Sequence, residues 1–257
     1  MINIDWNKVV NQFLYDAHNP LLFNNGFFVF FLVAFILCYY LFRKNYKHRA
    51  FVLTLFSLYF FYKASGAFVG IVILSAFFNY GISQLIYKAK KNSGKGFYLF
   101  CSVIFNLGVL FYFKYTNFFI EVLNAFSVLR FDPLHILLPI GISFFTFENL
   151  SYTIDVYRGE IEPEKGIVNY LLFLSFFPKL VMGPIVRAKD FIPQLKKEYF
   201  VSDSDFSRGF YLIVTGLIKK LIISDYISVN LVNYVFDGPH LHNGMECLVA
   251  LYGYAIV

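Results

Sequence analysis

Long apolar runs separated by short basic loops dominate the chain. Leu21 to Phe42 has no charged residue and is followed by a basic loop at 43–49. A second apolar run, Ala50 to Tyr87, is interrupted only near Lys63 to Gly66 and leads into the basic loop 88–95. A membrane-spanning helix needs about 20 mainly apolar residues, and the second run would make about 57 Å of helix. The pattern therefore predicts one spanning helix and then a pair of helices that turns near Lys63 to Gly66.

The basic loops orient these predicted spans. Lysine and arginine are enriched in short cytoplasmic loops, so loops 43–49 and 88–95 are both expected in the cytoplasm and the N-terminus outside. Gly96 to Phe113 then returns to the outer face. Apolar residues at helical spacing between Tyr115 and Leu129 predict a further helix. This helix either lies in the membrane interface or is an ordinary buried amphipathic helix.

The next apolar segments do not all fit as simple crossings. Leu137 to Gly159 and Ile167 to Ile185 precede a basic loop at 187–197. If both segments crossed and helix 115–129 did not, this loop would lie outside, against the charge rule. We therefore expect that one segment is broken or re-entrant, or that helix 115–129 crosses.

Two further apolar elements, Arg208 to Phe236 and Met245 to Val257, complete the pattern. A helix ending in mid-membrane would leave carbonyl groups unsatisfied in hydrocarbon. We therefore expect the chain to be truncated inside a transmembrane segment. Residues 1–257 are predicted to form a single all-α membrane domain, a polytopic transmembrane helical bundle with broken or re-entrant helices.

Composition supports this fold class. Hydrophobic residues make up 58% of the chain, above the 45–50% or so of soluble domains. The first apolar run is too long for a signal peptide and is followed by more spans. The net charge of +6 fits basic cytoplasmic loops, so no nucleic-acid partner is expected. The three cysteines lie in apolar runs, at spacings that suit neither a zinc site nor a disulfide framework.

The segment Leu137 to Gly159 carries many groups that lipid excludes. Pro139 and Gly141 would weaken the backbone hydrogen bonds of a helix. Polar side chains that could satisfy such groups follow them: Ser143, Thr146, Glu148, Asn149, Ser151 and Thr153. Ionisable residues within spans usually face a bundle interior or a wet cavity and are functional by default. Glu148 therefore predicts a polar interior, with a structural ion pair or a protonated carboxyl as the alternative.

A second group of polar residues surrounds Lys179. An unpaired lysine near the bilayer centre costs about 2.5–3.5 kcal/mol, so we hypothesise that Lys179 pairs with Glu148. Gly183 and Pro184 follow closely and suggest a break in the helix. Arg158 lies just past the apolar part of its segment, where it is either functional or a solvated interfacial anchor.

Familiar catalytic patterns are missing from the sequence. It contains no P-loop, no G-x-S-x-G and no H-E-x-x-H. His240 and His242 share one turn, but no third ligand stands near them, so no metal site is predicted. His18, His48 and His135 stand alone.

Four separated blocks resemble the membrane-bound O-acyltransferases. In chain order they are LGVLFYFKYTNFF, HILLPIGISFFTF with SYTIDVYRG, FFPKLVMGPIVR and GLIKKLIISD. They are most similar to the bacterial alginate O-acetylation branch, which is related to the D-alanyl transfer proteins of teichoic acid synthesis. The resemblance covers roughly residues 21–257.

The resemblance implies a multi-helix ring with a thinned, wet centre, of which this chain is the N-terminal part. It implies transfer of an acyl group from a cytoplasmic thioester, such as acetyl-CoA or an acyl carrier protein, to a hydroxyl outside. The expected reaction is O-acetylation of an extracellular or cell-envelope polysaccharide. The family's essential histidine belongs to a downstream block rich in Trp and Arg, so no catalytic residue is expected in this chain, and the fragment alone is expected to be inactive.

The family's motifs also assign roles by position. Arg158 matches the arginine of the DVYRG motif and, with Glu148, is expected to support the reaction. The residues expected to shape the tunnel are Pro139, Gly141, Ser143, Thr146, Asn149, Lys179, Gly183 and Pro184. The family usually has Gln in place of Glu148 and a neutral residue or His in place of Lys179. This chain therefore has an added negative charge at one position and an added positive charge at the other, which favours an ion pair.

The expected location is the bacterial cytoplasmic (inner) membrane, with several crossings and no bound cofactor or metal. Expected partners are membrane lipids, the hydroxyl acceptor and a periplasmic or extracellular acyltransferase. Two alternatives stay open: a transporter or flippase, whose sites also use broken helices at mid-membrane, and a catalytically inactive scaffold for a partner acyltransferase.

Overall fold

The computed structural model describes residues 12–17, 20–21, 23, 26–126, 130–180, 183–197 and 201–257. Every regular element in this part of the chain is a helix, which confirms the all-α class. The chain divides into two compact units, Met1–Glu198 and Tyr199–Val257. The single membrane domain stays a prediction, and the two units are described separately.

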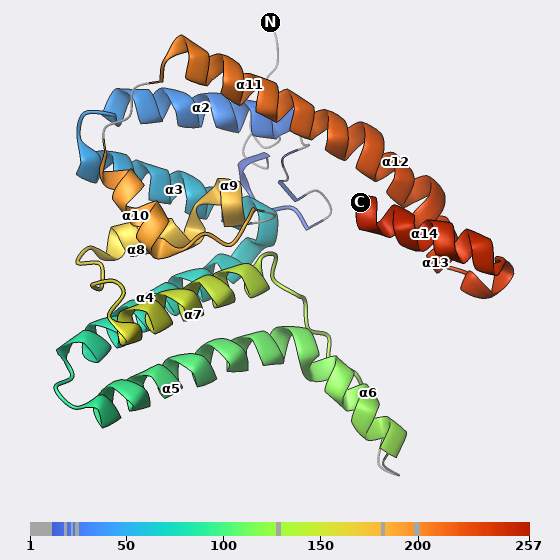
Figure 1. Ribbon diagram of the computed structural model, residues 1–257, viewed down its shortest axis with the longest axis horizontal. Helices are drawn as coiled ribbons and strands as arrows, with labels where there is room; N and C mark the ends of the chain where they lie inside the picture. The colour runs from blue at the N-terminus through green and yellow to red at the C-terminus, as the bar shows by residue number, and fades with distance from the viewer. Residues whose placement is uncertain are drawn as a thin grey trace, which may run out of the picture. The chain divides into compact units, whose positions relative to one another are not determined.

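The first unit contains most of the helices (Figure 1). In chain order they are α2 (Gly26–Phe42), α3 (Tyr46–Ser65), α4 (Val69–Lys88), α5 (Asn92–Leu110), the π-helical segment η2 (Phe111–Tyr115), α6 (Thr116–Phe126), α7 (Ile142–Arg158), α8 (Ile167–Ser175), α9 (Phe177–Leu180) and α10 (Ala188–Lys196). Two continuous helical stretches, Tyr46–Lys88 and Asn92–Phe126, are long and apolar enough to cross a membrane. The first predicted span is shorter than expected, because α2 begins only at Gly26.

The predicted turn within the second apolar run is confirmed. A short 3₁₀ segment, Gly66–Phe68, joins α3 to α4, and Gly66 has a left-handed φ of 63°. A Cβ on Gly66 would lie 2.8 Å from the ring of Tyr15, so the close approach also requires glycine. Lys63 is buried beside this turn, and its Nζ donates to the carbonyl oxygen of Gln12 at 2.8 Å and to that of Leu14. The one charge in the run is therefore satisfied by backbone from the N-terminal segment.

Pro139 and Gly141 do not interrupt a helix, contrary to the expectation from the sequence. Residues 130–139 contain no regular helix, and α7 begins after Gly141, whose φ of 74° is left-handed. The N–H of Ile142 donates to the carbonyl of Pro139 at 3.3 Å. The proline and glycine therefore form the turn that leads the chain into α7. Gly159, with φ 73°, ends the helix in the same left-handed conformation.

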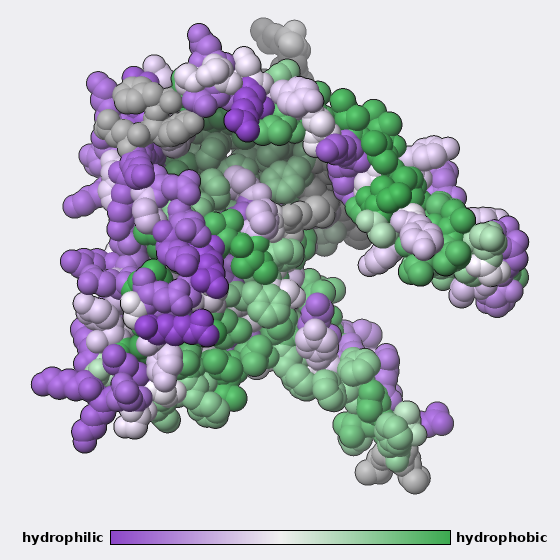
Figure 2. All heavy atoms as spheres, viewed as in Figure 1, coloured by the Kyte–Doolittle hydropathy of each residue, from purple (hydrophilic) through white to green (hydrophobic). Residues whose placement is uncertain are grey.

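Three basic segments lie at one end of this unit, namely 43–49, 88–95 and 187–197 (Figure 1). The Arg49 guanidinium near the start of α3 donates to the carbonyls of Leu195 at 2.5 Å and Lys197 at 3.0 Å. Figure 2 shows hydrophilic side chains along this side of the unit, over the loops that flank α3, α4 and α10. The segment from α8 to Arg187 starts at this end and returns to it, since Arg187 lies beside Asp155 in the last turn of α7.

Polar side chains join the helices inside the unit. Asn79 of α4 and Asn106 of α5 exchange hydrogen bonds of 3.2 and 2.7 Å, and both are buried. Ser102 of α5 links this pair to α7, because its hydroxyl lies 2.8 Å from Asn79 Oδ1 and 3.1 Å from Thr153 Oγ1. Such contacts hold helices together where the surroundings are apolar.

The second unit is a helical hairpin. Its first arm runs through α11 (Asp203–Leu217), η3 (Ile218–Ser224), α12 (Asp225–Ile227), η4 (Ser228–Val232) and α13 (Asn233–Phe236). After the short 3₁₀ segment η5 (Pro239–Leu241), α14 (Gly244–Ile256) packs back on η4 and α13. Ser202 and Asn243 form capping boxes with Asp205 and Glu246 at the starts of the arms. The two apolar elements expected here are confirmed.

Candidate functional site

The hypothesis that Glu148 pairs with Lys179 is confirmed. Lys179 Nζ lies 2.5 Å from Glu148 Oε1, and the two side chains are only 6% and 4% exposed. Glu148 sits in the middle of α7, whereas Lys179 belongs to the short helix α9. The pair therefore joins α7 to the irregular segment that follows α8.

Aromatic rings surround the lysine. Its Nζ lies 4.2 Å from the ring centre of Phe173 and 5.2 Å from that of Phe191, within the range of cation–π attraction. The backbone N–H of Val186 also donates a hydrogen bond to the Glu148 carboxylate. Each charge thus has a charged partner and a second polar or aromatic one, as a buried pair requires.

Gly183 holds the chain close to this pair. Its N–H donates to the carbonyl of Lys179 at 2.9 Å. A Cβ added at Gly183 would lie 2.3 Å from the Cα of Lys179, a distance that no side chain tolerates. The glycine that the sequence marked as a helix break is therefore what lets the backbone fold back over Lys179. Pro184, the next residue, is exposed.

The other predicted tunnel residues of α7 are mostly packed against protein. Thr146 and Asn149 are 1% and 0% exposed, and Ser143 is partly buried. Asn149 Oδ1 accepts a 2.6 Å hydrogen bond from the hydroxyl of Tyr170 on α8. In this unit the three residues pack between helices, and their role in lining a tunnel stays a prediction.

Arg158 lies apart from the buried pair. Its side chain is 61% exposed, and its guanidinium is 3.8 Å from the Glu160 carboxylate. Arg187 and Lys189 approach the same carboxylate, also at 3.8 Å. Arg187 further lies 3.9 Å from the buried carboxylate of Asp155. These distances exceed hydrogen-bonding range, so the group is a loose cluster of ion pairs in which Arg158 does not contact Glu148.

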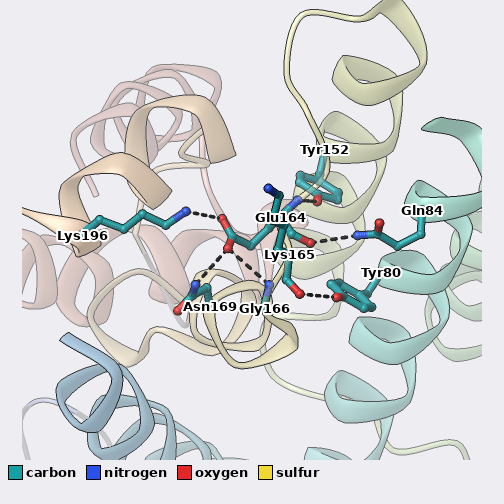
Figure 3. A network of polar contacts seen from close by, with 8 residues as sticks. All are labelled: Tyr80, Gln84, Tyr152, Glu164, Lys165, Gly166, Asn169 and Lys196. Carbon is teal, nitrogen blue, oxygen red and sulfur yellow. Dashed lines mark hydrogen bonds and ion pairs between the residues drawn. The ribbon is translucent and has the colours of Figure 1, made fainter. Parts of the chain in front are cut away.

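Glu164 forms a tighter network that the sequence analysis missed (Figure 3). One carboxylate oxygen accepts hydrogen bonds from Asn169 Nδ2 at 3.0 Å and the N–H of Gly166 at 3.3 Å. The other lies 2.7 Å from Lys196 Nζ on α10. The backbone of Glu164 bonds in addition to Gln84 of α4 at 2.8 Å and to the Tyr152 hydroxyl of α7 at 2.8 Å. One loop residue thereby connects α4, α7, α8 and α10.

The pKa of Glu164 lies below its ordinary value. Burial on its own would raise the pKa, but the hydrogen bonds from Lys196 and Asn169 favour the ionised form and outweigh burial. The sequence did carry a signal for this residue: Glu164 sits between Pro163 and Gly166 in a short charged loop that separates two apolar segments.

Around the shielded ion pair, the residues that the structure describes include no complete catalytic group. His48, His135, His240 and His242 stand on other elements than the Glu148–Lys179 pair. Among the described residues, no group of histidines, cysteines and acids could hold a metal ion. Lys179 Nζ and Glu148 Oε1 face each other at 2.5 Å in a buried contact that joins two segments, which fits a structural role.

Comparison with known proteins gives the affiliation of the chain. No family model and no solved structure matches it. It is 35% identical to the probable alginate O-acetylase AlgI of Azotobacter vinelandii over 80% of this chain and 42% of the relative. It is 30% identical to the peptidoglycan O-acetyltransferase of Helicobacter pylori over 84% of this chain and 47% of the relative. With the teichoic acid D-alanyltransferase of Bacillus subtilis the identity is 24%, over 76% of this chain and 52% of the relative.

The chain thus spans about half the length, or less, of these relatives. The similarity nevertheless extends over most of its own residues, in agreement with the four motif blocks and the helical structure. The chain belongs to a family of the membrane-bound O-acyltransferase type.

Proposed function

We propose that the full protein is an O-acyltransferase that acetylates hydroxyl groups of an extracellular or cell-envelope polysaccharide. The observation that carries this proposal is the similarity over 80% or more of the chain to alginate and peptidoglycan O-acetylating proteins. The donor would be a cytoplasmic thioester such as acetyl-CoA or an acyl carrier protein. A periplasmic or extracellular acyltransferase would be a partner.

The helices would cross the bacterial cytoplasmic membrane with their basic end inside. The contact of Arg49 with Leu195 and Lys197 supports this orientation, because it brings loops 43–49 and 187–197 to one end. In this arrangement α2, α3, α4, α5 and α7 cross, and residues 167–187 form a re-entrant segment. The charge rule then holds for every basic loop, and α6 need not cross.

Within this arrangement, the Glu148–Lys179 pair would anchor the re-entrant segment to α7 inside the membrane. Irregular backbone at membrane depth is tolerated only where it is buried in protein or lines a wet cavity. Mutual neutralisation lets both ionised side chains stay at that depth. The pair would thereby fix the shape of one wall of the acyl-transfer passage.

In the proposed reaction the acceptor oxygen attacks the carbonyl carbon of the thioester, and a base takes the hydroxyl proton. The carbon–sulfur bond breaks, and the thiol leaves with a proton. We expect the base to be a histidine outside residues 1–257. The residues of this chain would hold the scaffold in which donor and acceptor meet.

The test uses the full-length protein with its partner proteins in sealed inside-out vesicles. Acetyl-labelled donor is supplied on the cytoplasmic face and a polysaccharide acceptor is enclosed. We expect label to appear on the acceptor as an ester that mild base releases. Movement of the donor or another solute across the membrane, with no new ester on the enclosed acceptor, would contradict the proposal and favour a transporter.

A further inference from the structure

A cavity of about 300 Å³ opens beside the Glu164 network at the basic end of the first unit. The end of α7, the loop after it and α10 form its walls. Its charged lining residues are Glu162, Glu164, Lys189 and Lys196. This volume lies at the lower end of the range found for small-molecule sites.

The cavity combines apolar and charged walls. Ile161, Ile192 and Pro193 supply apolar surface. Two acids and two lysines supply charged surface, and the formal charges of the walls cancel. The site therefore suits a ligand that carries both signs of charge next to an apolar part.

Only some of these charges are already engaged. Lys196 and Glu164 hold each other at 2.7 Å. Lys189 Nζ lies 3.8 Å from Glu160, beyond hydrogen-bonding distance. Glu162 is exposed, and within the described part of the chain its carboxylate meets no cation. The cavity wall thus offers a ligand one carboxylate with no cation beside it and one ammonium with only a long ion-pair contact.

We propose that this cavity binds the headgroup of a zwitterionic phospholipid with a primary amine, that is, phosphatidylethanolamine. Lys189 faces the phosphate, Glu162 receives the ammonium, and Ile161, Ile192 and Pro193 pack along the glycerol and the first methylene groups. An anionic headgroup without an amine leaves Glu162 unpaired. The proposal rests on the membrane placement of the chain described under the proposed function, which puts α10 at the headgroup level of the cytoplasmic leaflet.

Native mass spectrometry of the full-length protein tests this proposal. The protein is delipidated and offered equal amounts of phosphatidylethanolamine and phosphatidylglycerol. We expect preferential retention of phosphatidylethanolamine, and an approximately fivefold fall in its preference over phosphatidylglycerol for Glu162→Gln, because one charge at a membrane surface contributes on that order. Lys189→Gln should weaken retention of both lipids.

Two matched controls neutralise exposed charges outside the cavity. Glu121→Gln on α6 and Lys165→Gln in the loop should both keep the wild-type preference. Equal retention of the two lipids by the wild type, or an unchanged preference in Glu162→Gln, would overturn the proposal. So would displacement of the lipid by inorganic phosphate or by soluble glycerophosphoethanolamine at comparable concentration, which would indicate a site for a free phosphorylated solute.

The membrane placement has a separate readout. If the folded protein retains no phospholipid of any kind, the placement of α10 at the membrane fails together with the lipid site. If phospholipids are retained without headgroup preference, the placement stands and the assignment of the cavity fails.

Discussion

Among the described residues of the first unit, two Glu–Lys pairs lie within hydrogen-bonding distance and fasten its later segments to its helical core, and the two pairs differ in their surroundings. Glu148 and Lys179 lie 2.5 Å apart with both side chains nearly inaccessible. Glu164 and Lys196 lie 2.7 Å apart, but the Lys196 side chain is 48% exposed. The first pair is enclosed by aromatic rings, whereas backbone and amide hydrogen bonds surround the second.

This difference decides what each pair contributes. In the enclosed pair each ion depends on the other, because neither can turn to water when its partner is removed. In the second pair the lysine can return to solvent, and Glu164 keeps the hydrogen bonds of Asn169 and Gly166. The same two residue types therefore make an interdependent unit in one place and a set of separable contacts in the other.

The largest predicted effect follows removal of one partner of the enclosed pair. Lys179→Gln or Glu148→Gln should each lower the free energy of unfolding by about 3–5 kcal/mol, since a buried charge is left without compensation. Thermal and denaturant unfolding of the full-length protein in detergent measures this loss.

The double variant Glu148→Gln/Lys179→Gln sharpens the result. It leaves no uncompensated charge, so its stability should lie much closer to the wild type than the sum of the single losses. Strictly additive losses would mean that the two residues do not act as a pair.

Next in size is the effect of filling the space over Lys179. Gly183→Ala places a Cβ 2.3 Å from the Lys179 Cα, so the segment must shift. Overpacking of this kind costs about 1–3 kcal/mol. A Gly209→Ala control, whose Cβ meets nothing within 4 Å, should leave the unfolding temperature unchanged or raise it slightly. Equal behaviour of the two variants would show that the close approach at Gly183 does not matter.

The more exposed pair should give a smaller loss that depends on pH. Glu164→Gln should cost roughly 1–2 kcal/mol at neutral pH, on the scale of one hydrogen bond to a charged group. Because the folded state lowers the pKa of Glu164 below 4.5, the contribution of its charge is complete above that value and is lost as the pH falls through the folded pKa.

Unfolding measured from pH 7 to pH 3 checks the sign of this dependence. The stability difference between the wild type and Glu164→Gln should narrow as the solution becomes acidic. A difference that widens with acid would mean that the folded state raises the pKa of Glu164.

The two pairs were not equally visible in the sequence. Glu148 and Lys179 stand out because each is a charge within an apolar run, and hydrocarbon leaves such charges few partners. Glu164 and Lys196 lie in polar stretches, where many pairings are possible and only the packed loop selects one. The helix pair that turns at Gly66 follows from the length of its apolar run and from the interruption near Lys63 to Gly66. The non-helical entry to α7 does not, because a proline and a glycine fit a kinked helix and a turn equally well.

The smallest stability effect is expected at Arg158, which extends the comparison to a side chain with only a long contact. Its guanidinium is 61% exposed and 3.8 Å from Glu160, so Arg158→Gln should change the free energy of unfolding by less than about 0.5 kcal/mol. Because Arg158 matches the arginine of the family's DVYRG motif, we nevertheless propose that it supports the reaction. The full-length variant should therefore keep its unfolding temperature and lose acyl transfer, while Lys165→Gln, a neutralised lysine in the loop that follows α7, keeps both. Wild-type transfer by Arg158→Gln would make the arginine an interfacial anchor, and a large loss of stability would mean that its contact with Glu160 behaves like the enclosed pair after all.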